Sequence, residues 1–556
     1  MPGSNLLAIS TEYRTANQNY MNTTKSLRPF LLFLSLLSYF YFETINSIRA
    51  QTRYIKNDSF WKTTDGKAIN SQGGGVFKFK DPKSGTSKYF WYGVHYDEAD
   101  LYRNDPSVTY PNATFESVSC YSSTDLINWK DEGDVLSKTE TNKNGKTWVG
   151  RLGVAYIQQL KKYAMFVQHG NQVLITISDT PNGQFTWYQK INMEPLIGTT
   201  NTGDQTVFTD EDTKKSYLIY SYGRGRNKIY VSEIGVKDGK IALLDCTEIF
   251  KGESREGNCM FKYKGKYYMY ASNIYGWDSS LAYYLVADDV KGPYLPINKM
   301  LVTDGSVDDY AHVSQTGFFI NVKGTKTETV IFCGDRWSDF AGNGLGYNQW
   351  CPLSFDGDIP YFNSLNTWKI DAKTGNWTVA KDNDFVKNGS FEADRKRIPS
   401  IVKPVQTQLT GWFTEIIEGN KISLDSLNSP NLNHFNTATE RKIVIGEKSL
   451  NISDKINFKR KISQIIASTK YVQLADGIYN LSAKVKNDGN FNNLEMFALS
   501  GGKKFTHHLE KANENWKHVV LKGIKISDGK IEIGFLAEGK PNAICLIDDV
   551  SLVKIR

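Results

Sequence analysis

A two-part repeat constrains the fold of this chain more than any other feature of its sequence. The first part is a polar turn followed by a short aromatic and aliphatic strand. It occurs at 87–93 (SKYFWYG), 161–170 (KKYAMFVQHG), 214–223 (KKSYLIYSYG), 265–272 (GKYYMYAS) and 328–337 (ETVIFCGDRW). The second part is another strand that ends in a small or acidic turn, and it occurs at 118–129, 174–185, 229–241 and 283–294. Because the two parts recur in the same order, the sequence predicts a repeat architecture.

Five such units, each of about four strands, predict a five-bladed β-propeller over residues 55–380. Aromatic residues make up 13% of the chain and there are 45 glycines, which favours strands and turns. The alternative is a large β-sandwich with several hairpins, but a sandwich does not require one unit to recur in order. In a propeller the innermost strands converge on one axis. Polar residues at their starts are therefore expected to face a shared site.

The pattern changes near residue 385. Short strands with alternating apolar and polar residues follow at 479–485, 494–500, 516–522, 531–537 and 547–555. This alternation predicts an all-β sandwich. The expected domains are a leader with a secretion signal at 1–50, a propeller at 51–384, and a β-sandwich (jelly roll) at 385–556.

The N-terminal segment has the pattern of a secretion signal. Lys25 and Arg28 precede an apolar run at 29–42, and Ala50 is the expected cleavage point. The apolar run is too short for a comfortable membrane span. We expect an exported protein, periplasmic or extracellular, with no membrane span once the signal is removed.

Charge and cysteine content argue against two classes of protein. The net charge is +8, but the basic residues are mixed with 59 acidic ones, and no basic block is interleaved with aromatics. Nucleic acid is therefore not an expected partner. The six cysteines stand singly without a C-x-x-C spacing, so we expect no zinc site and mostly buried free thiols.

Three polar residues stand near the starts of predicted inner strands. Glu256 precedes the strand of blade four, Asp204 takes the equivalent place in blade three, and Gln315 lies just before the strand of blade five. Equivalent positions in successive blades face the same axial pocket, so the three are candidate catalytic residues. The alternative is that Glu256 and Asp204 are solvated rim charges. A neighbouring Asp204 carboxylate would raise the pKa of Glu256 and suit it to act as a general acid.

The segments DQTVFTDEDTKKSYLIYS (204–221) and REGNCMFKYKGKYYMYAS (255–272) resemble those of glycoside hydrolase family 43, a family of inverting glycosidases with a five-bladed propeller. The resemblance covers most of 55–380. It implies that Glu256 is the general acid and that Asp204 tunes its pKa. An inverting enzyme also needs a group that activates water across the sugar, about 6.5–9.5 Å from the acid.

The opening TTDGKAINSQGGGVF (63–77) and GDRW (334–337) resemble the exo-β-1,3-galactanase branch of this family. Most family members carry a general-base Asp in the first inner strand, whereas 70–75 of this chain reads NSQGGG. The galactanase branch uses a glutamine in blade five, which implies that Gln315 is the water-activating group. A neutral amide is a poor base, so Gln315 would position the water or act through a tautomer or relay, and Asp308 and Asp309 are the alternative bases. The branch also has a substrate-contacting Glu in blade two, where this chain has Gly150.

Further residues are candidates for binding the sugar or an ion. Five are predicted to bind substrate, either by stacking or by hydrogen bonding: Gln72, Trp277, Arg336, Trp337 and Trp350. For the tryptophans, a place in the blade core is the alternative. No cofactor or metal is expected, although His312 is placed where a structural cation on the axis is conceivable.

The predicted function is that of an inverting, monomeric exo-glycosidase that releases sugars from plant galactan or arabinogalactan. The alternatives are an α-L-arabinofuranosidase on the same scaffold and a non-catalytic sugar-binding propeller. NGSFE (388–392) and IDDVSL (547–552) make the C-terminal domain similar to carbohydrate-binding jelly rolls, with an inert stabilising sandwich as the alternative.

Overall fold

The computed structural model describes ten stretches of the chain. They are residues 54–104, 110, 112–274, 280–306, 314–338, 343–393, 409–420, 432–433, 449–509 and 511–555; residues 144, 337–338, 343–347 and 432–433 are described by their backbone alone. The predicted secretion signal lies outside the described residues.

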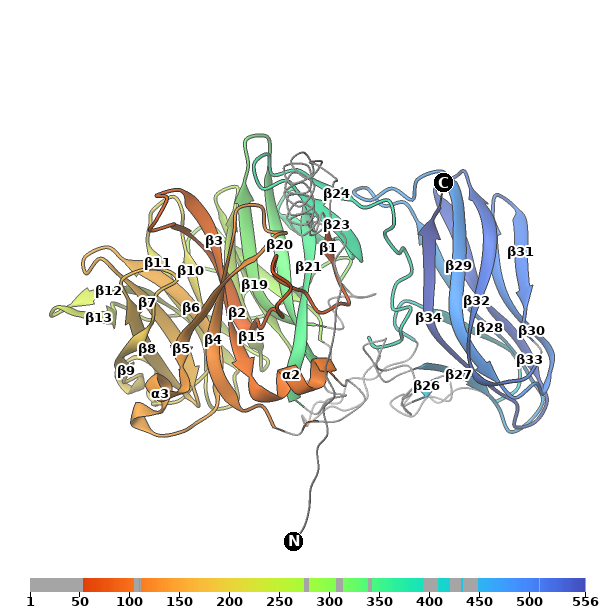
Figure 1. The fold of residues 1–556 in the computed structure, drawn as a ribbon, viewed down its shortest axis with the longest axis horizontal. Helices are drawn as coiled ribbons and strands as arrows, with labels where there is room; N and C mark the ends of the chain where they lie inside the picture. Colours follow the sequence, from red (N-terminus) through yellow and green to blue (C-terminus); the bar gives the residue numbers. More distant parts are fainter. Residues whose placement is uncertain are drawn as a thin grey trace, which may run out of the picture. The chain divides into compact units, whose positions relative to one another are not determined.

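Five antiparallel sheets follow one another along the first part of the chain (Figure 1). Blade one contains β2 (Gln72–Lys80), β3 (Ser87–Tyr96), β4 (Phe115–Ser123) and β5 (Lys130–Ser137). Blade two contains β6 (Val149–Ile157), β7 (Lys162–His169), β8 (Gln172–Ser178) and β9 (Thr186–Ile191). Blade three contains β10 (Thr202–Thr209), β11 (Ser216–Tyr222), β12 (Lys228–Lys237), β13 (Lys240–Leu243) and β14 (Thr247–Lys251). Blade four contains β15 (Glu256–Tyr263), β16 (Lys266–Ser272), β17 (Tyr283–Ala287) and β18 (Leu301–Val302), and blade five contains β19 (Gln315–Lys323), β20 (Glu328–Ser338), β21 (Asn343–Asp356) and β22 (Ile359–Phe362).

The repeat seen in the sequence corresponds to fixed positions in these blades. Its first part forms the second strand of each blade, namely β3, β7, β11, β16 and β20, and its second part forms the third strands β4, β8, β12 and β17. The first strands close a ring: β2 contacts β6, β6 contacts β10, β10 contacts β15, β15 contacts β19, and β19 contacts β2. The prediction of an all-β chain with a five-bladed propeller followed by a β-sandwich is confirmed.

A tryptophan cluster joins blade five to blade one. Trp91 of β3 and Trp350 of β21 lie 4.9 Å apart between ring centroids, and Trp61 packs edge-on against Trp350 at 5.1 Å. Asn57 donates a hydrogen bond to the carbonyl of Trp350 (2.9 Å) and accepts one from its backbone N–H (2.8 Å). The ring is thus closed by side chains rather than by a shared strand. Because Trp350 is completely buried in this cluster, the prediction that it stacks on a sugar is wrong.

Short elements complete this part of the chain. A small sheet consists of β1 (Ile55–Lys56), β23 (Thr367–Ile370) and β24 (Trp377–Val379). The helical segments among the described residues are α2 (Asp97–Asn104), α3 (Lys138–Thr141), α4 (Glu194–Ile197) and the 3₁₀ turn η1 (Asn142–Asn144). None of the described helices is long and apolar enough to cross a membrane.

The C-terminal part consists of two five-stranded sheets. One sheet has the order β25-β28-β33-β30-β31 and the other β26-β27-β34-β29-β32. The bounds are β25 (Phe413–Glu418), β26 (Leu432–Asn433), β27 (Ser449–Ser453), β28 (Phe458–Ala467), β29 (Gly477–Asn487), β30 (Phe491–Ser500), β31 (Lys503–His508), β32 (Asn513–Ile526), β33 (Lys530–Gly539) and β34 (Ile544–Lys554). Alternate residues of the two sheets, such as Leu481 of β29 and Phe535 of β33, meet in one apolar core. The five strands predicted for this region lie within or overlap β29, β30, β32, β33 and β34.

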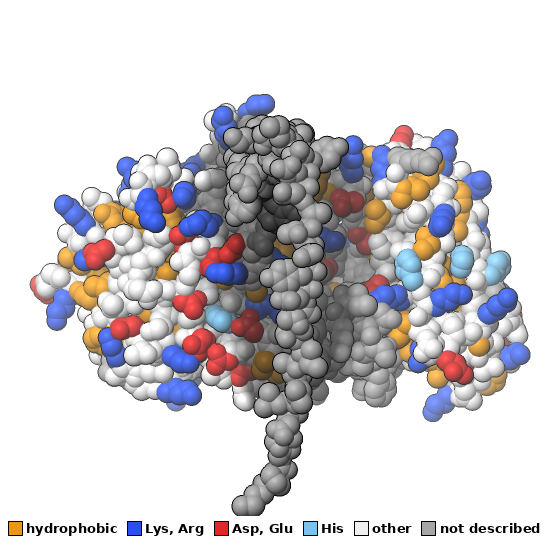
Figure 2. All heavy atoms as spheres, viewed as in Figure 1, with side chains coloured by type: hydrophobic (Ala, Val, Ile, Leu, Met, Phe, Trp, Pro, Cys, Tyr) orange, Lys and Arg blue, Asp and Glu red, His pale blue; other side chains and the backbone are white. Residues whose placement is uncertain are grey.

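Surface charge and thiols agree with the sequence analysis. All six cysteines lie among the described residues, and none of them forms a disulfide; five are buried and Cys246 is partly exposed. On the face drawn in Figure 2, basic and acidic side chains are interspersed and do not form a single basic patch.

Candidate active site

Each inner strand of the propeller begins with the same irregularity. At this point four residues of the inner strand lie opposite three residues of its neighbour, as in Glu256 to Cys259 of β15, whose end residues pair with Ser272 and Tyr270 of β16. The same one-residue bulge occurs in β2, β6, β10 and β19. The first bulge residues are Gln72, Val149, Thr202, Glu256 and Gln315, and the third are Gly74, Arg151, Asp204, Asn258 and Gly317. A bulge re-aims side chains that regular pairing would send to the sheet faces.

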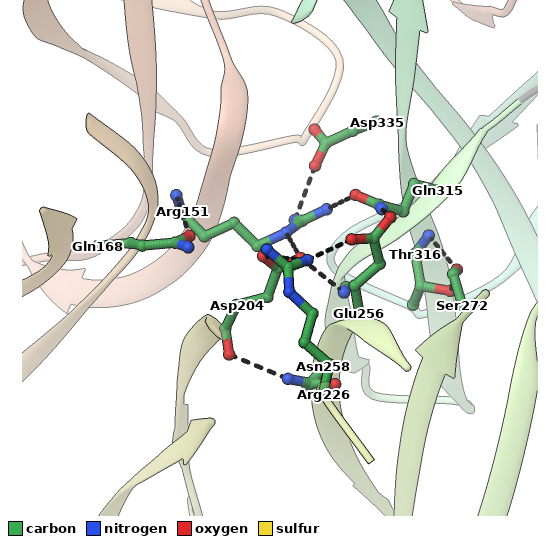
Figure 3. A network of polar contacts seen from close by, with 11 residues as sticks. Arg151, Gln168, Asp204, Arg226, Glu256, Asn258, Ser272, Gln315, Thr316 and Asp335 are labelled. Carbon is green, nitrogen blue, oxygen red and sulfur yellow. Dashed lines mark hydrogen bonds and ion pairs between the residues drawn. The ribbon is translucent and has the colours of Figure 1, made fainter. Parts of the chain in front are cut away.

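The bulges bring Glu256, Asp204 and Gln315 into one network at the axis (Figure 3). Glu256 and Gln315 come from first positions, whereas Asp204 comes from a third position. Asp204 is therefore two residues further along its strand than the equivalence drawn from the sequence implied. All three side chains are nearly inaccessible to solvent.

Arg151 lies at the centre of this network. Its Nε donates to Oδ2 of Asp204 (3.1 Å), its Nη1 donates to Oδ2 of Asp335 (2.8 Å), and its Nη2 donates to Oε1 of Gln315. Asp335 comes from β20 and also accepts a hydrogen bond from Nδ2 of Asn348 (2.9 Å). One guanidinium group thus joins blades two, three and five.

Two side chains hold the carboxyl of Glu256. Its Oε1 accepts a hydrogen bond from Nε2 of Gln315 (2.7 Å), and its Oε2 pairs with Arg226, which projects from the turn between β11 and β12. Asp204 is tied to the same strand, because its Oδ2 accepts from the backbone N–H of Gly257 (2.8 Å). This last bond requires the left-handed conformation of Gly257 (φ 65°), which glycine adopts without strain.

Burial and neighbouring charges shift the pKa values of Glu256 and Asp204 in opposite directions. Burial and the negative charge of Asp204 raise the pKa of Glu256 to about 8, although Arg226 and Arg151 act in the opposite direction. Burial also opposes ionisation of Asp204, but Arg226 and Arg151 outweigh it and hold the pKa of Asp204 below its ordinary value. Two carboxyl groups in contact with one cluster therefore have pKa values pushed apart, the arrangement that assigns an acid and a charged partner.

A charge count of the network leads to the same assignment. Three carboxyl groups, from Asp204, Glu256 and Asp335, contact two guanidinium groups, from Arg151 and Arg226. Unbalanced charge is costly in a buried site. The cluster is neutral when one carboxyl keeps its proton. Burial raises the pKa of Asp335 as well, but Glu256 is the carboxyl whose pKa is raised to about 8.

The contact between Gln315 and Glu256 corrects one expectation. The sequence analysis placed the water-activating group about 6.5–9.5 Å from the acid, which leaves room for water. In the structure the amide of Gln315 is hydrogen-bonded directly to Glu256. In this arrangement Gln315 orients the acid, and the prediction of a gap between these two side chains is wrong.

Residues 94–343 match the sequence profile of the family described as glycosyl hydrolases family 43. The matched part of the propeller belongs to family 43. The match runs from the end of β3 in blade one to the start of β21 in blade five, and it includes Asp204, Glu256 and Gln315. The chain is a glycoside hydrolase.

Solved structures with this fold include two exo-β-1,3-galactanases. The enzyme from Phanerochaete chrysosporium, solved with β-1,3-galactotriose, is 19% identical, with a TM-score of 0.51, and the alignment covers 90% of this chain and 100% of that one. The enzyme from Clostridium thermocellum is also 19% identical, with a TM-score of 0.50 and the same two coverages. At this identity the likeness shows a common fold. No curated protein sequence gives a significant match to the chain.

Gln72 is a second buried amide, besides Gln315, at the start of an inner strand. It occupies the first bulge position of β2, the position that Glu256 and Gln315 occupy in their blades. It is 4% exposed, and neither its Nε2 nor its Oε1 has a hydrogen-bond partner among the described residues. A buried amide without partners is costly, so this side chain is suited to bind a ligand.

Several predicted residues of the family 43 site are not brought together by the described structure. Trp277, Asp308, Asp309 and His312 lie outside the described residues. Trp337 belongs to β20, and only its backbone is described. Arg336 is buried next to Asp335, and successive side chains of a strand point to opposite faces, so its predicted role in binding stays a prediction. No group of three or more metal-binding side chains occurs among the residues that the structure describes.

The sequence analysis missed Arg151, Arg226 and Asp335 as members of the site. For Arg151 a signal was available, because a residue-Gly-polar triplet starts three inner strands: VGR (149–151), TGD (202–204) and EGN (256–258). Alignment of these triplets places Arg151 beside Asp204. Arg226 comes from a turn, and a charged turn residue looks like any solvated charge until the fold is known.

Proposed function

We propose that this chain is an exported, inverting exo-glycosidase that releases galactose from β-1,3-linked galactan or arabinogalactan. The observation that carries this proposal is Glu256, whose pKa is raised to about 8 within a network that also contains Asp204 and Gln315. A carboxyl that is still protonated at neutral pH is what a leaving oxygen requires.

The proposed reaction breaks the bond between the anomeric carbon and the glycosidic oxygen. Glu256 donates its proton to that oxygen as it leaves, and a water attacks the anomeric carbon from the opposite face. Asp204 stays ionised, paired with Arg151 and Arg226, and keeps Glu256 protonated through like-charge repulsion.

The two amides of the site are assigned to the water and the sugar. Arg151 holds Oε1 of Gln315, which fixes the amide plane. When a sugar enters and separates Gln315 from Glu256, the amide is placed to orient the attacking water. Gln72, with two unpartnered atoms, is assigned to a sugar hydroxyl. An amide does not readily take a proton, so Asp308 and Asp309 are the proposed acceptors of the proton that the water loses.

The test compares the full-length chain with Glu256→Gln on β-1,3-galactan, nitrophenyl β-galactopyranoside and nitrophenyl α-L-arabinofuranoside. We expect galactose release, with the α anomer formed first as seen by NMR, and a loss of about 10²–10⁴-fold in Glu256→Gln. Glu253→Gln is the matched control, because Glu253 stands three residues upstream with its side chain 80% exposed.

Other outcomes would replace this proposal. An α-L-arabinofuranosidase is the alternative because Gly150 stands where the galactanase branch has a substrate-contacting Glu, and hydrolysis of the arabinofuranoside alone would establish it. Binding of galactan without hydrolysis would favour a sugar-binding propeller. An unchanged rate in Glu256→Gln would remove Glu256 from the acid role.

A further inference from the structure

Trp148 and Gly150 form an unusual pair at the start of β6. A Cβ atom placed on Gly150 would lie 2.1 Å from Cη2 of the Trp148 indole. No larger residue fits at this position unless the ring moves. The indole therefore occupies the space that a side chain at position 150 would take. Trp148 is 37% exposed, so part of its ring surface is open to solvent.

Blade three shows where this space lies. Gly203 is the second bulge residue of β10, as Gly150 is of β6. A Cβ atom on Gly203 would lie 2.3 Å from Oγ of Ser221 and 3.3 Å from Nε of Arg226, the residue that pairs with both Asp204 and Glu256. Because the two blades repeat the same bulge, Trp148 lies in blade two beside the position that Ser221 and Arg226 border in blade three. That position borders the catalytic network.

Contacts of Tyr96 support this placement. Its hydroxyl donates to the carbonyl of Val149 (2.9 Å), at the first bulge position of β6. Burial is the main reason that the pKa of Tyr96 is raised. Asp335 and Arg151 act on the same hydroxyl through their charges, and the Trp148 side chain acts on it through a hydrogen bond. The indole is thus anchored at the edge of the polar network while part of its surface meets solvent.

We propose that the Trp148 indole forms a stacking wall of the sugar-binding site and selects hexopyranoses that have one apolar face. In galactopyranose the axial hydroxyl leaves the C–H groups of C3, C4 and C5 together on one face, and such a face packs on an aromatic ring. A furanose offers no comparable flat apolar face. The proposal rests on the proposed function, because it places the sugar beside Glu256. It also gives a reason for Gly150: the glycine makes room for the ring.

The kinetic test uses nitrophenyl β-galactopyranoside. We expect Trp148→Ala to raise KM about tenfold and to change kcat less than about threefold, and Trp148→Phe to recover most of the affinity. Gly150→Ala keeps the indole but displaces it, so it should raise KM in the same direction. Tyr156→Ala is the matched control, because Tyr156 is an exposed aromatic residue (39%) near the other end of β6. An unchanged KM in Trp148→Ala, with an unchanged melting temperature, would overturn the proposal.

A binding measurement separates this proposal from the catalytic one. Glu256→Gln and the double variant Glu256→Gln/Trp148→Ala are titrated calorimetrically with β-1,3-galactobiose and with methyl α-L-arabinofuranoside, whose ring is locked as a furanose. We expect an about tenfold weaker Kd for galactobiose in the double variant and no matching loss for the arabinofuranoside. If the native chain hydrolyses no glycoside, the proposed function fails, yet the two Kd values still decide on stacking. Equal Kd values, or no binding to either protein, would overturn the stacking wall. An equal loss for the arabinofuranoside would overturn its selectivity for pyranoses.

Discussion

The proton on Glu256 is the feature on which the chemistry of single residues depends. Its carboxyl is buried against Asp204, and its pKa is raised to about 8. The general acid must be protonated, so activity is expected to fall as the pH rises through about 8. Asp204→Asn removes one cause of the raised pKa and leaves Arg151 and Arg226 free to stabilise the ionised form. This variant should move the alkaline limb of the pH–rate profile to lower pH.

The measurement is kcat/KM between pH 5 and 10. Asp238→Asn, in an exposed turn of blade three, serves as the control and should leave the profile in place. A profile that stays unchanged in Asp204→Asn would show that Asp204 does not tune the acid.

The raised pKa of Glu256 should also make the free energy of unfolding depend on pH. Its pKa is near 4.5 in the unfolded chain and about 8 in the folded protein, so between these values the folded state holds a proton that the unfolded state has lost. The free energy of unfolding of the native chain therefore decreases from pH 4.5 to 8 through this group. Glu256→Gln has no titrating group at this position and lacks this pH dependence. The melting temperature of Glu256→Gln minus that of the native chain should therefore rise as the pH increases from 4.5 to 8. A difference independent of pH would contradict the raised pKa; Glu253→Gln is the control.

Three residues of the site could be predicted from the sequence alone. Glu256, Asp204 and Gln315 are polar residues where apolar strands begin, which is visible without a fold. Asp335 follows an apolar run, ETVIFCGD (328–335), and its partner Arg151 is 184 positions away, so only ring closure brings the two together. Trp350 was misassigned because stacking and core packing use the same residue type.

The bulges are the structural elements that turn five similar strands into a site. Gly257 is needed at the second bulge position of β15. It has φ 65°, and a Cβ atom there would lie 2.4 Å from the carbonyl oxygen of Thr316. The alternating pattern of a strand does not reveal one inserted residue. This is why the sequence analysis placed Asp204 and Glu256 at equivalent positions when they are two residues apart.

Gly257→Ala should be strongly destabilising. The backbone conformation alone costs about 1–2 kcal/mol for a residue with a Cβ atom, and the clash with Thr316 adds to that cost. Gly265→Ala is the matched control, since Gly265 has φ 83° and nothing within 4 Å of its added Cβ atom. Urea unfolding should show a larger loss for Gly257→Ala, together with reduced activity. Equal losses would mean that the bulge tolerates a side chain.

At the scale of the whole molecule, the ring depends on the tryptophan cluster between blades five and one. The fold itself was predictable, because each blade is a local repeat that the sequence shows directly. The closure was not, since Asn57 and Trp350 are 293 positions apart and neither belongs to the repeated pattern.

Trp350→Ala should weaken the packing between blades five and one. Loss of a fully buried tryptophan costs about 3–5 kcal/mol, and the cost should fall on the propeller. Differential scanning calorimetry is expected to show a lower midpoint for the propeller transition, while Trp148→Ala, at an exposed tryptophan of the same domain, should leave it nearly unchanged. A propeller transition that keeps its midpoint in Trp350→Ala would show that the ring is held elsewhere.

The repeated bulge has a consequence for protein engineering. Main-chain geometry aims the first and third bulge residues of every blade toward one axis. Gly74 and Gly317 must stay glycine, because an added Cβ atom would lie 1.8 Å from the carbonyl oxygen of Tyr92 and 2.7 Å from that of Cys333. Exchanging residues among the other eight positions should alter which bond the propeller cleaves, or whether it cleaves at all. A library limited to these eight positions would therefore sample new specificities on the same scaffold.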